Sequence, residues 1–538
     1  MKASEIRQSF ISFFEEKNHQ LVRSSSVVPV DDPTLLFTNA GMNQFKPILL
    51  GEKEANPSRA VNSQKCIRVS GKHNDLEEVG IDGFHHTFFE MLGNWSFGDY
   101  YKKDAIRWAW EYFTEVLKLD KNRLFVSVYI DDDEALDLWV NLTDIDPNRV
   151  LKFGKKDNFW EMGETGPCGP CSEIHYYMGE DISNIDPAGV NTTDEYWELW
   201  NLVFIQYNRQ TDGSLEDLPA KHVDTGAGLE RIVSVMQGKS SNYDTDLFTP
   251  IIQSIESMTG KSSEGDSVPF QVIADHIRML SFTIADGALP SNDGRGYVLR
   301  RILRRAARFG RILDQHDPFL FQLVEPVVNI MGDIYPELKE KQAHIEKIIQ
   351  SEEMSFNKTL DRGIQHFEKY IGKIEGDIIP GAEAFKLYDT YGFPLDLTEL
   401  MARENNLSVD NDGFDQEMKK QKARAKAAGK FKTNTELEWN IVSDGFDSMF
   451  VGYRLLEGNF SIRRWASSGD STIIVLDSTP FYAESGGQVG DIGLISGDGF
   501  SVRVKDVKKD GDTFFHYCDG FIPESALDEQ VDCKGEDE

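Results

Sequence analysis

The hydrophobic pattern of this chain changes character twice, and these changes limit the fold more narrowly than any other feature. From residues 35–238, short alternating runs such as 124–130 mix with Gly-rich turns and aromatic clusters. This texture is typical of a mixed or antiparallel sheet braced by helices. Over 270–430 the apolar period becomes mainly helical. After about residue 452, β-branched runs return between Gly-rich turns and predict a small β-barrel or sandwich.

The length of 538 residues is too great for a single core. We therefore expect an α+β chain of three domains, 1–240, 241–452 and 453–538, with a polar linker at 261–266. An amphipathic helix is predicted to open the chain, because Ile6, Phe10, Phe13 and Phe14 recur at helical spacing. Ser4 is its expected N-cap.

Composition excludes several classes of protein. A formal net charge of −33 argues against general electrostatic binding of nucleic acid, so that any such contact must be local. Five cysteines are too few, and odd in number, for a disulfide framework. No run approaches the roughly 18 apolar residues of a membrane span. These features favour a cytoplasmic protein with reduced thiols.

The densest chemical signal lies at 65–101. Two strand-like pieces, one carrying Arg68 and the other Phe88-Phe89-Glu90, flank a loop rich in Gly, Lys, His, Asn and Asp. This arrangement would direct Arg68 and Lys72 at one anion, because a guanidinium binds phosphate oxygens in a bidentate manner and a lysine adds a point charge. A solvated polar hairpin loop is the alternative.

A second signal lies at 222–232, HVDTGAGLERI, where a Gly-rich turn is expected to enter a helix carrying Glu230 and Arg231. Such turns allow close approach of the backbone to a ligand, although they are also common structural features. Neither a dinucleotide-binding GxGxxG unit nor a GxxxxGK[ST] phosphate loop occurs in the sequence. A nucleotide would therefore be bound by another geometry.

Together these two signals resemble the second and third signature motifs of class II aminoacyl-tRNA synthetases. Further segments narrow the resemblance to the alanyl-tRNA synthetases. They lie in the family's order and span nearly the whole chain: 31–47, 66–80, 85–100, 157–176, 198–209, 223–232, 294–306, 387–398 and 480–491. The resemblance implies a catalytic antiparallel sheet flanked by helices, followed by a helical domain that recognises tRNA and a small β-barrel.

The resemblance also implies residues that bind ATP. Arg68 matches the arginine expected at the α-phosphate, where charge grows in the transition state, and Arg231 matches the arginine expected near the γ-phosphate. Gly228 marks a close approach of the backbone to the nucleotide. The remaining expected ATP contacts are Lys72, Asp75, His86, Trp160, Leu199, Trp200 and Asn201. For His86, a hydrogen-bonded structural role is the alternative.

The same resemblance assigns a pocket for alanine. Asp224 is expected to bind the ammonium group, Asn201 the carboxylate, and Val203 with Trp160 the methyl group. The competing interpretation of Asp224 is an N-cap of the following helix. Such a pocket discriminates poorly against glycine and serine, by only roughly 1–3 kcal/mol.

The expected tRNA contacts lie in the helical region. A helix over 297–311 would carry Arg300, Arg304, Arg308 and Arg311 on one face and Leu299, Ile302, Leu303 and Ala306 on another. A second basic helix is expected over 419–432. Either could be a solvated face. The resemblance adds Asn292 and Asp389 as readers of a G·U pair in the acceptor stem.

No zinc site is expected. Cys168 and Cys171 lack a second ligand pair and are predicted to lie buried in a Gly-Pro turn. His516, Cys518 and Cys533 form an equally weak candidate for a metal site. The family's editing centre uses a His-x-x-x-His pair, which this sequence lacks. We therefore expect a fragment without the editing centre and without the family's C-terminal segment.

The implied reaction is activation of L-alanine with ATP and Mg2+, followed by transfer to the 3′ end of tRNA(Ala). The expected partners are alanine, ATP and the acceptor stem, with neither DNA nor a membrane. Glu198 is a candidate Mg2+ ligand. The alternatives are a ligase that loads a non-tRNA acceptor, and a non-catalytic RNA-binding relative; the latter would have lost Arg68 and Arg231, which are present.

Overall fold

The structure is a computed structural model of the chain. It describes residues 1–29, 35–70, 73–76, 78–163, 165–291, 294–374, 376–428, 439–443, 449–452, 455, 457–468, 471–483, 491–497, 499–510, 513–520, 522 and 530–535. These residues form two compact units, Met1–Asp410 and Asn411–Glu538. The expected division at residues 240 and 452 stays a prediction.

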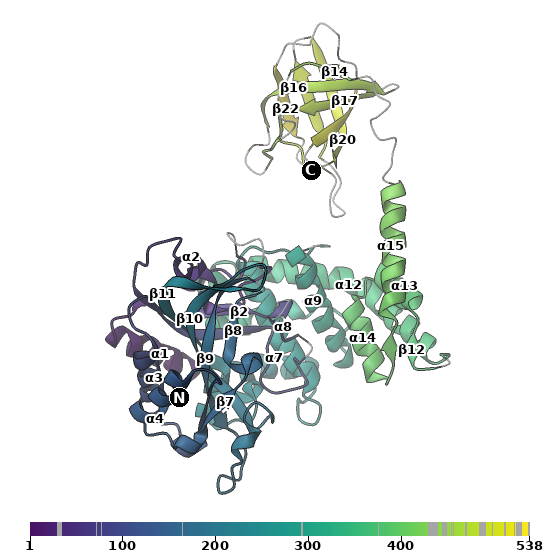
Figure 1. The fold of residues 1–538 in the computed structure, drawn as a ribbon. Coiled ribbons are helices and arrows are strands. Elements are labelled where there is room, and N and C mark those ends of the chain that lie inside the picture. Colours follow the sequence, from purple (N-terminus) through teal and green to yellow (C-terminus); the bar gives the residue numbers. More distant parts are fainter. Residues whose placement is uncertain are drawn as a thin grey trace. The chain divides into compact units, whose positions relative to one another are not determined.

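The first unit contains, in its described residues, a nine-stranded sheet (Figure 1). Its strands are β1 (Gln20–Leu21), β2 (Arg59–Ile67), β5 (Phe88–Phe97), β6 (Leu124–Tyr129), β7 (Val150–Phe153), β8 (Phe159–Glu161), β9 (Gly166–Tyr177), β10 (Tyr196–Arg209) and β11 (Leu215–Gly228). They are ordered β1-β2-β5-β11-β10-β9-β6-β7, with β8 paired to β9. Only the β1–β2 and β6–β7 pairs are parallel, so the predicted antiparallel sheet is confirmed.

Helices cover this sheet and continue beyond it. Those preceding β11 are α1 (Ala3–Glu16), α2 (Lys46–Leu49), α3 (Lys102–Glu111), α4 (Asp133–Leu142) and α5 (Lys155–Asn158). Those following it are α6 (Leu229–Gln237), α7 (Thr249–Thr259), α8 (Val268–Ala285), α9 (Gly294–Ile312), α10 (Val324–Met331), α11 (Pro336–Glu340), α12 (Gln342–Ile371), α13 (Gly381–Tyr391) and α14 (Leu395–Glu404). The expected change to a helical pattern is confirmed.

The first helix forms because its apolar side chains share one face. Ile6, Phe10 and Phe14 are buried, and Phe10 packs 5.4 Å from the ring of Trp200 on β10. The expected N-cap is wrong: the helix begins at Ala3, one residue before Ser4, and the Lys2 backbone N–H donates to Glu5 Oε2 at 2.7 Å. Lys2 is thus the N-cap residue, and an acidic side chain in the first turn accepts from its backbone N–H.

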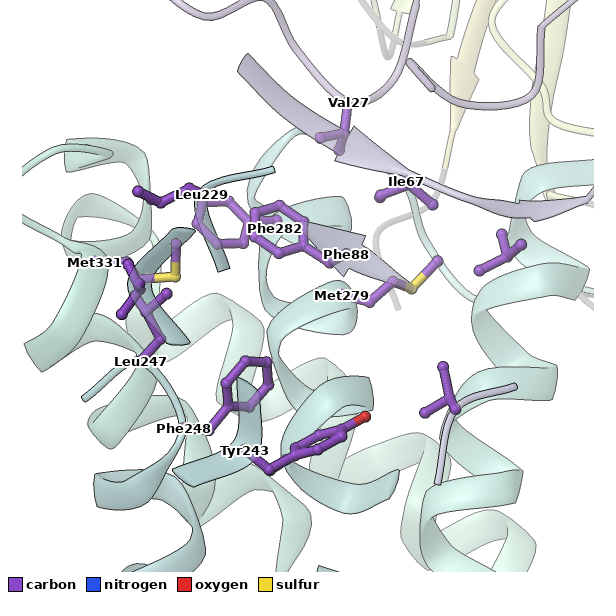
Figure 2. Close-up of a cluster of buried hydrophobic side chains, with 14 of the residues drawn as sticks. Val27, Ile67, Phe88, Leu229, Tyr243, Leu247, Phe248, Met279, Phe282 and Met331 are labelled. Atoms are coloured by element: carbon purple, nitrogen blue, oxygen red, sulfur yellow. The ribbon is translucent and has the colours of Figure 1, made fainter. Parts of the chain in front are cut away.

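A hydrophobic core joins the sheet to α8 (Figure 2). Phe88 of β5 stacks on Phe282 of α8, with ring centroids 4.2 Å apart and an interplanar angle of 5°. Phe248 and Met279 lie in the same cluster. Nearly all of α8 is buried, which explains why its apolar residues occur all round the helix and not on a single stripe. The helices after residue 240 therefore brace the sheet directly.

The second unit combines α15 (Asn411–Ala428) with a barrel. The barrel strands are β14 (Asn440–Ile441), β16 (Glu457–Ser468), β17 (Ser471–Leu476), β19 (Gly493–Gly497), β20 (Phe500–Asp510), β21 (Thr513–Asp519) and β22 (Gln530–Gly535). The order β14-β16-β17-β21-β20-β19-β22 closes on itself because β22 also pairs with β16. Closure removes free sheet edges, and the predicted small barrel is confirmed. Among the described helices, none has the length and apolar character needed to cross a membrane.

Candidate active site

A cavity of about 250 Å³ opens over the middle of the nine-stranded sheet. Its walls come from β5, β8, β10, β11, the start of α6 and the segment after β2. The lining residues predicted from the sequence are Arg68, Asp75, His86, Trp160, Glu198, Leu199, Asn201, Val203, Asp224, Gly228 and Arg231. The structure thus brings together side chains from segments that are far apart in the sequence.

Arg68 follows β2 directly and lies in the cavity wall. Its Nε donates to the Asn39 carbonyl at 3.2 Å, and its guanidinium lies 5.0 Å above the ring of Phe89. The stacking partner is the residue that pairs with Cys66 across the β2–β5 register. A guanidinium held over an aromatic ring is pre-organised to bind an anion.

Arg231 reaches the same cavity from the first turn of α6. Its Nη1 donates to the Glu198 carbonyl at 2.9 Å, and its guanidinium lies 5.1 Å above the ring of Phe84. The positive end of the helix dipole adds to its charge. Both predicted phosphate arginines therefore face one space, each supported by an aromatic ring.

Buried charges link α6, which carries Arg231, to β5, which carries the Phe89 ring beneath Arg68. Glu230, beside Arg231, accepts from Arg278 at 2.6 Å and from the backbone N–H of Glu90 at 3.1 Å. Glu90, beside Phe89, binds Arg7 through two contacts at 2.7 and 2.6 Å. Paired and hydrogen-bonded buried ions of this kind fix geometry. The framework couples the position of α6 to that of β5.

Asp224 is a buried carboxylate in the middle of β11. It accepts a hydrogen bond from Trp95 Nε1 at 2.6 Å. Burial raises the pKa of Asp224 to about 7, a shift that the Trp95 hydrogen bond opposes. The N-cap interpretation is wrong, because α6 begins at Leu229 after Gly228 and Asp224 lies inside the strand. Such a carboxylate is suited to pairing with a small cation.

Val203 and Trp160 lie in the lining beside this carboxylate. Val203 pairs with Asp224 in the β10–β11 register, so both side chains lie on one face of the sheet. Val203 and Trp160 also pack in one small apolar cluster with Cys171 and Ile205. Asn201 is two residues away on the same face, and its Nδ2 donates to Glu173 at 3.0 Å.

The sequence predicted that the glycine-rich stretch is a turn. This prediction is wrong, because the stretch lies in a strand. Residues 222–228 complete strand β11, and α6 follows without an intervening loop. Gly226 lines the cavity, where a Cβ would lie 2.7 Å from Met91 Sδ. Here glycine serves close packing, because it makes room for the Met91 side chain.

His86 lines the cavity but has protein partners at both ring nitrogens. Nδ1 lies 3.2 Å from Asp275 Oδ1, Nε2 lies 2.9 Å from Asn242 Nδ2, and the ring stacks on Phe248 at 4.8 Å. These contacts favour the structural alternative raised for this histidine. Its role as an ATP contact stays a prediction.

Trp200 does not line the cavity. From Leu199 to Val203 the side chains of β10 alternate, so Leu199, Asn201 and Val203 face the cavity while Trp200 faces the core. The Trp200 ring packs 5.1 Å from Phe113 and 6.0 Å from Tyr112. Its assignment to the nucleotide wall is therefore wrong. Lys72 lies outside the described residues.

Several lining residues were not predicted from the sequence. They are Ala40, Phe84, His85, Phe89, Met91, Thr225, Gly226, Glu230 and Asn242. The aromatic rings beneath the arginines had a signal, because Phe84 and Phe89 lie within the motif that carries Arg68. Ala40 also had a signal, because it lies within the 31–47 segment of the resemblance, whereas Asn242 had none, since it comes from a segment without a motif.

The expected arginine helix is present as α9, with Leu299, Ile302, Leu303 and Ala306 buried as predicted. Its arginines are paired within the chain: Arg300 Nε donates to Glu352 at 2.8 Å, and Arg304 Nη1 to the Gly392 carbonyl at 2.5 Å. Arg311 Nε donates to Asp361 at 2.7 Å, and Arg308 is buried. The stripe is thus packed against α12 and its neighbours. Asp389 is exposed on α13, and Asn292 lies outside the described residues.

The cysteine pair lies in strand β9, not in a turn, and both thiols are free and buried. Burial raises the pKa of Cys168 to about 11. His516 is likewise structural, since its Nε2 lies 2.7 Å from Thr479 Oγ1 and its Nδ1 3.0 Å from the Ile474 carbonyl. Within the described segments, no cluster of three His, Cys, Asp or Glu side chains could hold a metal ion.

Residues 5–537 match the family described as tRNA synthetases class II (A). An alanine--tRNA ligase of Chlorobium phaeovibrioides is 54% identical over 96% of this chain and 59% of its own length. The alanine--tRNA ligase of Chlorobaculum tepidum is 54% identical over 99% of this chain and 61% of its own length. That of Legionella pneumophila is 48% identical over 98% of this chain and 62% of its own length.

The chain thus spans about three fifths of the length of the curated relatives that it matches. The resemblance drawn from the sequence motifs is confirmed over 96–99% of the chain. The chain belongs to the class II tRNA synthetases, in the family described as tRNA synthetases class II (A).

Proposed function

We propose that this chain activates L-alanine with ATP and transfers it to the 3′ end of tRNA(Ala). One observation carries the proposal: Arg68 and Arg231, from separate motifs, line one cavity together with the buried carboxylate of Asp224. The matched relatives bear the name alanine--tRNA ligase. Two arginines and a carboxylate in one cavity suit a substrate pair in which the triphosphate is anionic and the amino acid carries an ammonium group.

In the first step, the alanine carboxylate attacks the α-phosphorus and pyrophosphate leaves. Arg68 binds the α-phosphate, where negative charge grows, and Arg231 binds the outer phosphates. Gly228, Leu199, Trp160, Asp75 and His86 surround the nucleotide. Asp224 neutralises the ammonium group, and Val203 with Trp160 limits the space for the side chain to a methyl group.

Mg2+ is expected to accompany ATP. A magnesium ion in such sites binds one or two carboxylates together with substrate phosphates. Glu198 is the proposed ligand, because it carries a carboxylate and lines the cavity together with both arginines. The ion would neutralise part of the triphosphate charge, while the arginines fix its orientation.

In the second step, the terminal ribose hydroxyl of the tRNA attacks the mixed anhydride. Arg300 and Arg304 of α9 and Asp389 of α13 are the proposed contacts with the acceptor stem, together with Asn292. Because Arg300 and Arg304 are paired with Glu352 and the Gly392 carbonyl, tRNA phosphates would have to replace or share these partners. Local cationic contacts of this kind suit a chain with a net charge of −33.

The test is ATP–pyrophosphate exchange across a panel of amino acids. The unsubstituted chain should exchange with alanine, and Arg68→Ala should lower the rate at least about a hundredfold. Asp224→Asn should raise the KM for alanine. Arg107→Ala and Asp137→Asn remove an exposed arginine and an exposed aspartate far from the cavity and should leave the rate unchanged.

Exchange that survives Arg68→Ala would refute the phosphate role. Unchanged alanine selectivity in Asp224→Asn would refute the ammonium role. Exchange with alanine but without charging of tRNA would favour a ligase that loads a different acceptor.

A further inference from the structure

A buried polar cluster lies behind the amino-acid end of the cavity. Asn201 of β10 pairs with Glu173 of β9 in the strand register, and its Nδ2 donates to Glu173 Oε1 at 3.0 Å. The other carboxylate oxygen of Glu173 accepts from Ser127 Oγ at 3.0 Å and lies 3.3 Å from His175 Nε2. Glu173 is thus held from the side opposite to Asn201.

This contact fixes which way the Asn201 amide points. The Glu173 oxygen accepts from Nδ2, so the NH2 end of Asn201 faces Glu173. The carbonyl oxygen, Oδ1, then lies on the other side of the amide. In the described part of the structure, Oδ1 is buried and has no hydrogen-bond partner. A buried acceptor left without a donor is unfavourable by roughly 1–3 kcal/mol, which points to a donor supplied by a ligand.

The surroundings of Asn201 indicate the kind of donor. Asn201 pairs with Gly226 on β11, and Asp224 lies two residues from Gly226 on the same face. A Cβ at Gly226 would lie 2.7 Å from Met91 Sδ, so the glycine makes room for the Met91 side chain beside them. Asn201 and Asp224 both line the cavity, so two acceptors, the carboxylate of Asp224 and the amide oxygen of Asn201, belong to the lining of one space. A primary ammonium, with three donors, matches both.

We propose that Glu173 is a positioning residue that turns the carbonyl oxygen of Asn201 toward the ammonium group of the amino acid. Asn201 then accepts from the ammonium and does not donate to the carboxylate, which reverses the role implied by the resemblance. The inference rests on the proposed amino-acid activation and adds the orienting residue for the amino-acid subsite.

The test separates the two ends of the substrate. L-alaninol carries the ammonium without a carboxylate, and propionate carries the carboxylate without an ammonium. Inhibition of pyrophosphate exchange by each is measured in the unsubstituted chain, in Glu173→Gln, and in the control Glu195→Gln, which changes an exposed carboxylate just before β10. A glutamine can donate to Oδ1 as well as accept from Nδ2, so it no longer fixes the amide.

In Glu173→Gln, alaninol inhibition should weaken at least about tenfold, while propionate inhibition and the KM for ATP stay within about twofold. The control should match the unsubstituted chain. Unchanged alaninol inhibition, or an equal loss for both analogues, would overturn the inference. If the unsubstituted chain shows no exchange with alanine, the proposed function itself fails, and the inference fails with it.

A second pair of variants tests the inference even if Glu173→Gln does not fold. Asn201→Asp keeps an oxygen toward the cavity and can share a proton with Glu173, whereas Asn201→Ala keeps none. Alaninol inhibition should stay within about threefold in the first and weaken at least about tenfold in the second. The reverse pattern, in which Asn201→Asp loses affinity for propionate and both variants retain alaninol, would show that Asn201 binds the carboxylate.

Discussion

The raised pKa of Asp224 predicts a pH dependence for alanine binding. The ammonium group pairs with the ionised carboxylate only. Burial raises the pKa of this carboxyl from 3.8 to about 7 in the free protein, so the ionised fraction falls as the pH drops through 7. Lowering the pH from 8 to 6 should therefore weaken alanine binding, although alanine itself stays zwitterionic over this range.

The magnitude follows from the titration. With a pKa of about 7, the ionised fraction is about nine tenths at pH 8 and about one tenth at pH 6, so Kd should rise about tenfold, or about 1.4 kcal/mol. The difference between 3.8 and about 7 corresponds to about 4 kcal/mol. That free energy is the penalty for holding the charge in its buried site, and an ammonium partner offsets it.

Calorimetric titration of alanine at pH 6, 7 and 8 measures this dependence. In buffers with different ionisation enthalpies at pH 7, binding should release about half a proton. Asp224→Asn should bind alanine weakly and without pH dependence. A Kd that is constant from pH 6 to pH 8 in the unsubstituted chain, with no proton release, would refute the ammonium role of Asp224.

Further predictions follow from packing and charge. Gly226→Ala should raise the KM for alanine and lower stability by about 1–3 kcal/mol, because the new Cβ would lie 2.7 Å from Met91 Sδ; steady-state kinetics and thermal melts check this, and Met91→Ala in the same chain should restore part of both. Trp200→Ala should destabilise the chain by about 3–5 kcal/mol in chemical denaturation yet leave the KM for ATP within about twofold, whereas a large rise in that KM at full stability would return Trp200 to the nucleotide wall. Glu352→Gln should strengthen binding of an acceptor-stem duplex, since it weakens the Arg300 ion pair of 2.8 Å; weaker binding in a filter or fluorescence assay would argue against α9 as a tRNA contact. Arg7→Ala should destabilise the chain by about 3–5 kcal/mol because it leaves Glu90 buried without its ion-pair partner, and a loss below about 1 kcal/mol in denaturant unfolding would show that this network contributes little.

Much of the fold could be predicted because its signals are local. Alternation over 124–130 and 471–476 marks strands β6 and β17, and the helical period over 297–311 marks α9. The convergence of Arg68 and Arg231 was accessible through motif spacing and resemblance. In each case a short segment carries its own pattern.

The errors have a different cause. The direction of a side chain in a strand and the residues that it packs against depend on segments that are distant in the sequence. Trp200 was grouped with Leu199, yet Leu199 faces the cavity and Trp200 faces the core on the other side of the sheet. Gly226 was interpreted as part of a turn, because Met91, its packing partner, lies on another strand. The partners of the α9 arginines, such as Glu352, come from a helix about fifty residues away.

The central claim is that one cavity binds the triphosphate through Arg68 and Arg231 and the amino acid through Asp224. The most direct test is a crystal structure of the chain with 5′-O-(N-alanylsulfamoyl)adenosine, a stable analogue of alanyl-adenylate. We predict that Arg68 lies within hydrogen-bond distance of the sulfamoyl group and that the ammonium group contacts Asp224. An analogue bound outside this cavity, or bound in it with its ammonium turned away from Asp224, would contradict the account.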